Sequence, residues 1–125
     1  MNIYPALLRL TGLNHQEAAD FHKITKVSVS SWSRGAFKAP ESRNAELHGL
    51  LKRQKAEAER IMDGVQDRFF AGDKFKGKIT IRFYKTDGAA QLEGWPCKAA
   101  HDTAIALALA SLPLEILSVL SFIDT

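Results

Sequence analysis

Residues 13 to 40, LNHQEAADFHKITKVSVSSWSRGAFKAP, constrain the fold of this chain more than any other segment. Asn14 and Glu17 have the spacing of a capping box, which predicts a helix that begins at residue 15 and ends at about residue 22. Thr25 is a suitable cap for a second helix directly after it. The segment therefore predicts two short helices that are joined by a tight turn.

The second of these helices has one apolar side. Val29 and Trp32 share a face at a three-residue step, so that face is predicted to be buried. Lys26, Ser30 and Ser31 then fall on other faces of the helix. Because a helix placed in this way can lie in the DNA major groove, sequence-specific DNA binding is the leading hypothesis.

The charge distribution agrees with a polyanionic partner. Residues 1 to 45 contain six basic and three acidic residues and so carry the whole net charge of +3, since the remaining residues contain eleven of each sign. The composition, 46% apolar and 25% charged, supports a real core and excludes wholesale disorder. A single cysteine and the lack of a charged leader before an apolar run indicate a cytoplasmic protein.

The middle of the chain predicts a long helix and then a strand. Apolar residues from Glu41 to Phe70 recur at three- and four-residue steps, with Gly64 as a point where the helix bends or divides. Residues 78 to 85 alternate between apolar and polar, which predicts a half-buried strand, and Asp87-Gly88 is typical of a turn. Residues 91 to 98 are expected to form a second, less regular strand. Since an isolated two-stranded ribbon is marginal in water, we expect it to pair across a dimer or to pack on the long helix.

The last part of the chain, from Ala99 to Ile123, is apolar and interrupted at Pro113. Two short buried helices are favoured over a membrane span. The resulting prediction is a mainly α fold with a small β element. A helix-turn-helix DNA-binding domain in residues 1–60 leads through the long helix to a dimerisation region in residues 61–125, with a strand at about 78–85 and C-terminal helices.

Residues 13 to 35 resemble, without a gap, the helix-turn-helix of the Cro/repressor (XRE-type) class of transcriptional regulators. The matching residues are Ala19 in the first helix, Ile24 after the turn, Val29 and Trp32 in the second helix, and Gly35 and Pro40 beyond it. Three residues depart from the pattern. Lys23 stands where glycine is usual in the turn, and Ala18 and His22 stand where leucine is usual. A lysine in the left-handed conformation costs about 1–2 kcal/mol, so the turn is the weakest part of the resemblance.

The resemblance implies roles for individual residues. The residues that it places near base edges are Lys26, Val27, Ser30 and Ser31, and those that it places near phosphates are Asn14, His15, Gln16, Arg34 and Lys38. A lysine donates to guanine acceptors, and a valine contacts the thymine methyl group. The N-terminus of the preceding helix favours a phosphate through its backbone N–H groups. The alternative for each residue is an ordinary solvated surface position.

The second half is similar to the C-terminal part of the anti-CRISPR-associated autorepressors of phages. The similarity depends on Arg82-Phe83-Tyr84, Gly94-Trp95 and the alanine-rich helix after them. It implies a homodimer that binds an inverted repeat in the promoter of its own operon, in a phage or prophage. The residues then assigned to dimerisation are Ile79, Ile81, Phe83 and Trp95. The alternative is that Phe83 and Trp95 belong to the core of some other small domain.

Two other functions stay open: an antitoxin that regulates its operon while it binds a toxin, and a helix-turn-helix used for protein or RNA contact. Catalysis is not expected. Cys97, His101 and Asp102 are close in sequence, but they supply only half a zinc site, and no oxyanion site accompanies the cysteine. We therefore expect no metal, no cofactor and no small-molecule ligand.

Overall fold

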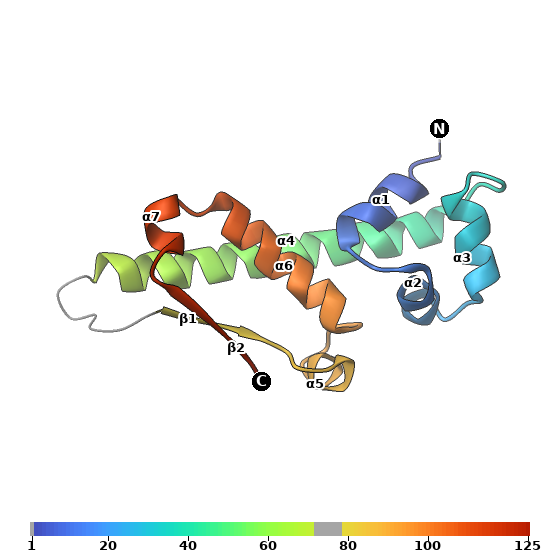
Figure 1. The fold of residues 1–125 in the computed structure, drawn as a ribbon. Coiled ribbons are helices and arrows are strands. Elements are labelled where there is room, and N and C mark those ends of the chain that lie inside the picture. The colour runs from blue at the N-terminus through green and yellow to red at the C-terminus, as the bar shows by residue number, and fades with distance from the viewer. Residues whose placement is uncertain (1, 72–78) are drawn as a thin grey trace.

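The computed structural model describes residues 2–71 and 79–125. Its elements in chain order are α1 (Tyr4–Thr11), α2 (His15–His22), α3 (Lys26–Ser33), α4 (Glu41–Phe70), β1 (Ile79–Phe83), α5 (Asp87–Leu92), α6 (Lys98–Ser111), α7 (Leu114–Leu117) and β2 (Leu120–Asp124). The long helix α4 spans the molecule, with α1, α2 and α3 around its N-terminal end and the strands beside its C-terminal half (Figure 1). The predicted mainly α fold with a small β element is confirmed.

The helices of the N-terminal part begin at the predicted caps. The Asn14 side chain accepts a hydrogen bond from the backbone N–H of Glu17 at 2.8 Å, and the Glu17 carboxylate accepts one from the N–H of Asn14 at 2.9 Å. Thr25 accepts from the N–H of Ser28 at 3.3 Å, which caps α3. Lys23 joins the two helices in the left-handed conformation, with φ 60° and ψ 47°. The turn therefore keeps a geometry that favours glycine, although a lysine occupies it.

The helix α4 has the predicted bounds and continues through Gly64 without interruption. Around it lie two groups of buried side chains. The first cluster joins α1, α2, α3 and the start of α4 to α5 and the beginning of α6, and includes Tyr4, Val29, Leu47, Trp95 and Ala100. The second cluster joins the end of α4 to β1, the end of α6, α7 and β2, and consists of Val65, Ile79, Ile81, Ile105, Leu112, Ile116 and Leu120. The two cores do not follow the predicted division at residue 60, because residues after position 90 complete the first one.

A buried glutamine joins three helices beside the first cluster. Gln54 is fully buried, and its amide donates to the carbonyl of Thr11 at 2.8 Å and to that of Ala100 at 2.9 Å. These bonds connect α1, α4 and α6. Since α4 and α6 also contribute side chains to both clusters, the two cores share their scaffold.

The second strand is not where the sequence placed it. Residues 91–98 contain the end of α5 and the connection to α6, so the predicted strand there is wrong, and Asp87-Gly88 begins α5 instead of a turn. Thr86 explains the difference, because its side chain caps α5 by accepting from the N–H of Ala89 at 3.1 Å.

The strand β2 comes from the C-terminal segment, for which two helices were predicted. The helix α6 is present, but after the single turn of α7 the chain becomes β2 and pairs with β1 in parallel, with Ile79 opposite Leu120. The partner of β1 is therefore in its own chain. The strand β1 packs on the long helix at Val65, which is one of the two arrangements that the sequence predicted. Within the described ranges, the helices fall short of the length and apolar character needed to cross a bilayer.

Candidate nucleic-acid interface

One side of α3 is anchored in the first cluster. Val29 is fully buried, and the partly buried Trp32 ring contacts the Tyr4 ring edge-on, with a centroid distance of 5.4 Å. The other side is exposed. Lys26 is exposed, and Val27 has 74% of its surface accessible. Ser30 and Ser31 lie at the margin between the two sides and are partly exposed.

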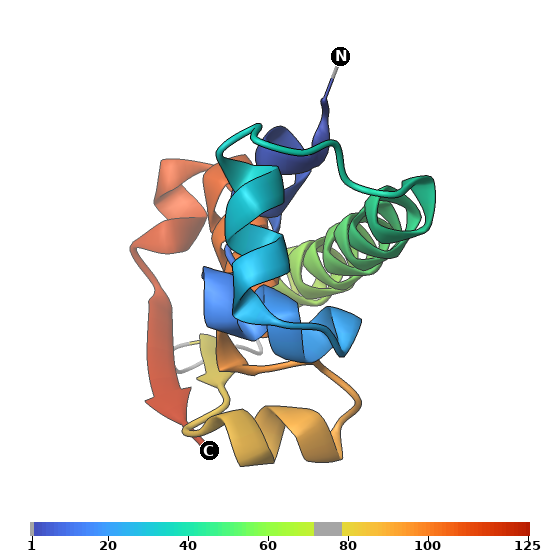
Figure 2. The same cartoon turned by 90° about the vertical axis from the view of Figure 1, so that its right-hand side faces the viewer.

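The exposed side of α3 is also unobstructed by the rest of the fold. When the molecule is viewed along α4, α3 lies at the front, and no other described element lies before it (Figure 2). An elongated ligand therefore has access to this face. All four residues predicted to face bases belong to this helix, so the fold brings Lys26, Val27, Ser30 and Ser31 together.

The N-terminus of α2 lies next to this helix. Asn14 uses its backbone N–H and its side-chain oxygen in the capping box, so its main part is to fix the start of the helix. The N–H groups of His15 and Gln16 follow in the first turn, and they have no acceptor among the described residues. These two groups are at the positive end of the helix and are oriented to bind an anion.

A hollow of about 550 Å³ connects this helix end with α3. Asn14, His15 and Gln16 line one part of it, and Arg9 and Lys26 line another. Arg9 is not among the residues that the sequence predicted to lie near phosphates. The only sequence signal for Arg9 was its place as a basic residue in the last turn of a helix directly before the capping box. The position of Arg9 relative to Lys26 depends on how α1 packs on α3.

Two further residues that were predicted to contact phosphates, Arg34 and Lys38, lie beyond the other end of α3. Arg34 is exposed and donates from Nε to the carbonyl of Ser30 at 3.3 Å. Lys38 is exposed in the connection to α4, next to Phe37, which has 69% of its surface accessible. Cationic side chains are therefore present near both ends of the exposed face.

A hydrogen-bonded group of side chains links α1, α2 and α4 beside the Trp32 ring of α3. The Tyr4 hydroxyl is 3.1 Å from His22 Nε2, and the other ring nitrogen of His22 is 3.3 Å from Glu46, although this second contact is poorly aligned as a hydrogen bond. Arg43 donates to the Glu46 carboxylate at 2.6 Å and to the carbonyl of His22 at 3.2 Å.

Burial dominates the acid–base properties of this group. It lowers the pKa of His22, although the nearby Glu46 carboxylate acts in the opposite direction, and it raises the pKa of Tyr4 to about 12. Burial thus favours the neutral form of His22 in the fold. The departure from leucine at this position has a structural reason, since the imidazole links α2 to α1 and α4.

The residues assigned to dimerisation contact their own chain. Ile79 and Ile81 are buried in the second cluster. Trp95 is buried in the first cluster, beneath the Arg53 guanidinium, which is 4.0 Å from the ring centroid. Phe83 is partly exposed and packs beside Phe122, with a centroid distance of 5.8 Å. Of the four, only Phe83 keeps an accessible surface for a partner, and the dimerisation role stays a prediction.

The residues around Cys97 have structural roles. Burial raises the pKa of the Cys97 thiol to about 11, so the thiol is protonated at neutral pH. His101 lies 2.8 Å from Glu57, and Asp102 pairs with Lys98 at 2.7 Å, so neither is directed at the thiol.

Cys97 instead lies close to two carboxylates. Its sulfur and the oxygens of Glu17 and Asp87 are all within 4.8 Å of one another. Both carboxylates already accept backbone hydrogen bonds at helix starts, Glu17 from Asn14 and Asp87 from the N–H of Lys98 at 2.9 Å. This group is therefore explained by helix capping, without a metal.

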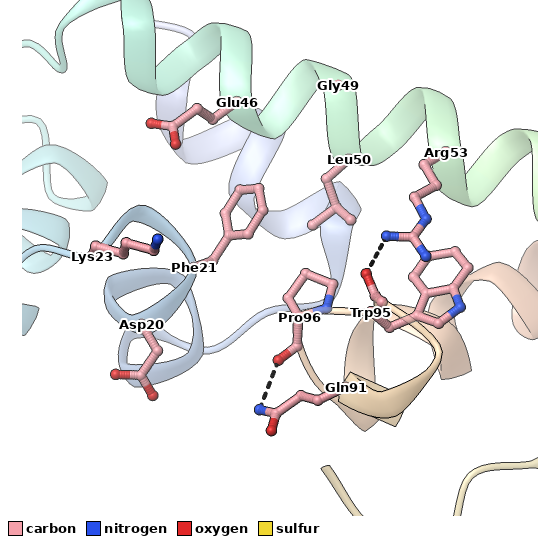
Figure 3. A pocket seen from close by; sticks show the side chains of 11 residues that line it. Asp20, Phe21, Lys23, Glu46, Gly49, Leu50, Arg53, Gln91, Trp95 and Pro96 are labelled. Atoms are coloured by element: carbon pink, nitrogen blue, oxygen red, sulfur yellow. Dashed lines mark hydrogen bonds between the residues drawn. The ribbon is translucent and has the colours of Figure 1, made fainter. Parts of the chain in front are cut away.

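A wider hollow of about 840 Å³ separates α2 from the connection between α5 and α6 (Figure 3). Phe21 and Leu50 point into it from α2 and α4, and Trp95 and Pro96 form its other wall. Its charged residues have both signs and are Asp20, Lys23, Glu46 and Arg53. With two residues of each sign, the hollow does not select the charge of a ligand.

A comparison of the sequence with models of protein families and with curated proteins finds no match. The function is therefore inferred from the residues and the geometry of the chain itself.

Proposed function

We propose that this chain binds duplex DNA through α3 and represses transcription in the cytoplasm. It would bind as a homodimer to an inverted repeat in the promoter of its own operon. The exposed face of α3 carries the proposal. Val27 keeps 74% of its surface accessible beside Lys26, while Val29 and Trp32 anchor the opposite side. An apolar and a cationic side chain held outward on an anchored helix suit the mixed surface of the major groove.

The chemistry of each side chain fits one part of the groove. The Lys26 ammonium group is a donor for the O6 and N7 acceptors of guanine, and Val27 is an apolar partner for a thymine methyl group. The Ser30 and Ser31 hydroxyls both donate and accept. Phosphates on either side would be bound by the free N–H groups of His15 and Gln16, and by the cations Arg9, Arg34 and Lys38.

The small size of the binding face supports the proposed homodimer. A recognition helix of eight residues is about 12 Å long and reads only a few base pairs. Two copies on an inverted repeat would place their recognition helices about 34 Å apart, in successive major grooves. The partly exposed Phe83 of β1 and the exposed Phe122 of β2 lie side by side and would offer an apolar surface to the second copy.

DNA binding is tested with fluorescence anisotropy on the duplex upstream of the gene and on a scrambled duplex, each at two salt concentrations. We expect the double variant Lys26→Ala, Ser30→Ala to lose at least about 1–3 kcal/mol of preference for the specific duplex while its circular dichroism is unchanged. The control Lys55→Ala, Ser42→Ala alters two exposed residues of α4 and should retain the preference. A Lys26/Ser30 variant that binds the specific duplex with wild-type affinity would refute base reading by α3.

The oligomeric state is tested by light scattering after size exclusion. The wild-type chain should be a dimer, and Phe83→Asp should be a monomer that keeps its helical content. A monomeric wild type would exclude the symmetrical arrangement. Binding that does not distinguish the specific from the scrambled duplex would instead favour a helix-turn-helix used for protein or RNA contact.

A further inference from the structure

A cleft between α4 and β1 lies near the end of the molecule opposite to α3. It has a volume of about 300 Å³. Arg60 and Arg68 line it from α4, Thr80 and Arg82 line it from β1, and His101 lines it from α6. No acidic residue is among the described residues that line this cleft, in contrast to the hollow in Figure 3.

The three arginines make the cleft strongly cationic. Arg60 and Arg68 are separated by two steps of four residues, so they lie on the same face of α4. Arg60 also forms an ion pair with Glu57, which neutralises part of its charge. Arg68 and Arg82 are exposed, and neither forms an ion pair with another residue in the described ranges. At least two positive charges are therefore available to an anion.

Gly64 opens the space between Arg60 and Arg68. A side chain at this position would meet no atom within 4 Å, and the residue does not adopt a positive φ. Neither packing nor backbone conformation explains a glycine here, where it costs about 1 kcal/mol of helix stability relative to alanine. Its effect is to leave the wall of the cleft without a side chain.

The strand β1 adds neutral donors. Its residues Ile79 and Phe83 bond to β2 through their backbone groups, so in the alternating pattern of a parallel pair the N–H groups of Thr80 and Arg82 lie on the unpaired edge. The Thr80 hydroxyl is only 3.3 Å from that of Ser121, and either can donate outward.

We propose that this cleft binds a small organic phosphate. The planar guanidinium group donates two parallel hydrogen bonds to phosphate oxygens, which makes arginine the preferred partner of this anion. Arg68 and Arg82 would bind the phosphate group, and Thr80 would complete its shell. The partly exposed aliphatic side chain of Ile61 would contact the organic part of the ligand. The site is at the far end of α4, so the inference does not depend on DNA binding by α3.

The test is isothermal titration calorimetry of the full chain at low salt with inorganic pyrophosphate, adenosine monophosphate and adenosine. Both phosphates should bind, and adenosine should not. The double variant Arg68→Gln, Arg82→Gln should weaken binding of adenosine monophosphate by at least about tenfold, which corresponds to about 1.4 kcal/mol. The matched control Lys52→Gln, Lys55→Gln removes two exposed charges of α4 outside the cleft and should leave the affinity within about threefold of wild type.

A second variant tests whether ligand binding depends on the shape of the cleft as well as on its positive charge. Gly64→Leu keeps all three arginines but places a side chain in the opening, so it should abolish binding of adenosine monophosphate without lowering the melting temperature. The proposal is overturned if neither phosphate binds, if both double variants lose equal affinity, or if Gly64→Leu binds normally. It is also overturned if the arginine variant weakens only duplex DNA binding, since the cleft would then contact a nucleic-acid backbone.

Discussion

The two ends of this molecule are stabilised in different ways. The first cluster, around α2 and α3, combines aromatic rings with directional hydrogen bonds beside them, such as those of His22 with Tyr4 and Arg43. The second cluster, around β1 and β2, consists of aliphatic side chains. Directional contacts fix the orientation of a helix, whereas aliphatic burial stabilises without fixing direction. The end with the candidate DNA-reading helix is thus the end that combines aromatic packing with side-chain hydrogen bonds between helices.

The largest expected effect comes from breaking the second cluster. Ile79→Ala removes a side chain that is 1% exposed and should lower the free energy of unfolding by about 2–5 kcal/mol. The control Ile123→Ala changes a residue of β2 that is 43% exposed, so its cost should be below about 1 kcal/mol. Urea denaturation followed by circular dichroism measures both.

The same experiment tests whether the two ends unfold together. Both tryptophans, Trp32 and Trp95, pack in or against the first cluster, so tryptophan fluorescence reports on that end alone. Because α4 and α6 contribute side chains to both clusters, the fluorescence and circular dichroism transitions of Ile79→Ala should coincide. A fluorescence transition at clearly higher urea would show that the first cluster is stable by itself.

A smaller effect, confined to the first cluster, is expected from pH. Burial lowers the pKa of His22 in the fold, so below the ordinary value of 6.5 the unfolded chain binds a proton that the folded chain does not. The contribution of His22 to stability is therefore unfavourable in acid and disappears as the pH rises above 6.5. Thermal melts between pH 5 and pH 7.5 should show a weaker pH dependence for His22→Gln than for wild type. Equal slopes for the two proteins would contradict a neutral, buried His22.

The smallest effect is expected at the turn between α2 and α3. Lys23→Gly relieves the left-handed conformation and should stabilise the fold by about 1 kcal/mol. The control Lys52→Gly places the same substitution in the exposed interior of α4 and should destabilise it by about 1 kcal/mol. A chemical denaturation series that gives both variants the same sign would show that Lys23 is not strained.

The sequence predictions were also more accurate at the end that contains α2 and α3 than at the end that contains β1 and β2. The bounds of α2, the caps Asn14 and Thr25, and the full length of α4 were predicted, because capping and periodicity are local signals. The strand at β1 was found from its alternation, but its partner was not. A parallel partner comes from a distant part of the chain, here β2, and no local pattern specifies such pairing.

The candidate sites show the same limit. The exposed positions of Lys26 and Val27 were predictable from helical periodicity, given that Val29 and Trp32 are apolar. The position of Arg9 beside Lys26 was not, since it depends on the packing of α1 against α3. The cleft of Arg60, Arg68 and Arg82 was likewise not predictable, because it forms only when the strand β1 packs beside the helix α4.

The sequence by itself determined where α2, α3 and α4 lie and which of their faces are apolar, because those properties depend on neighbours within a few residues. Only the tertiary structure decided how these faces combine. It completed the first cluster with Trp95 and Ala100, buried Ile79 and Ile81 within the protomer, and paired β1 with the C-terminal strand. The physical reason is that hydrophobic burial is favourable with any apolar neighbour. Which distant segments pack together is therefore decided by the packing of the whole chain.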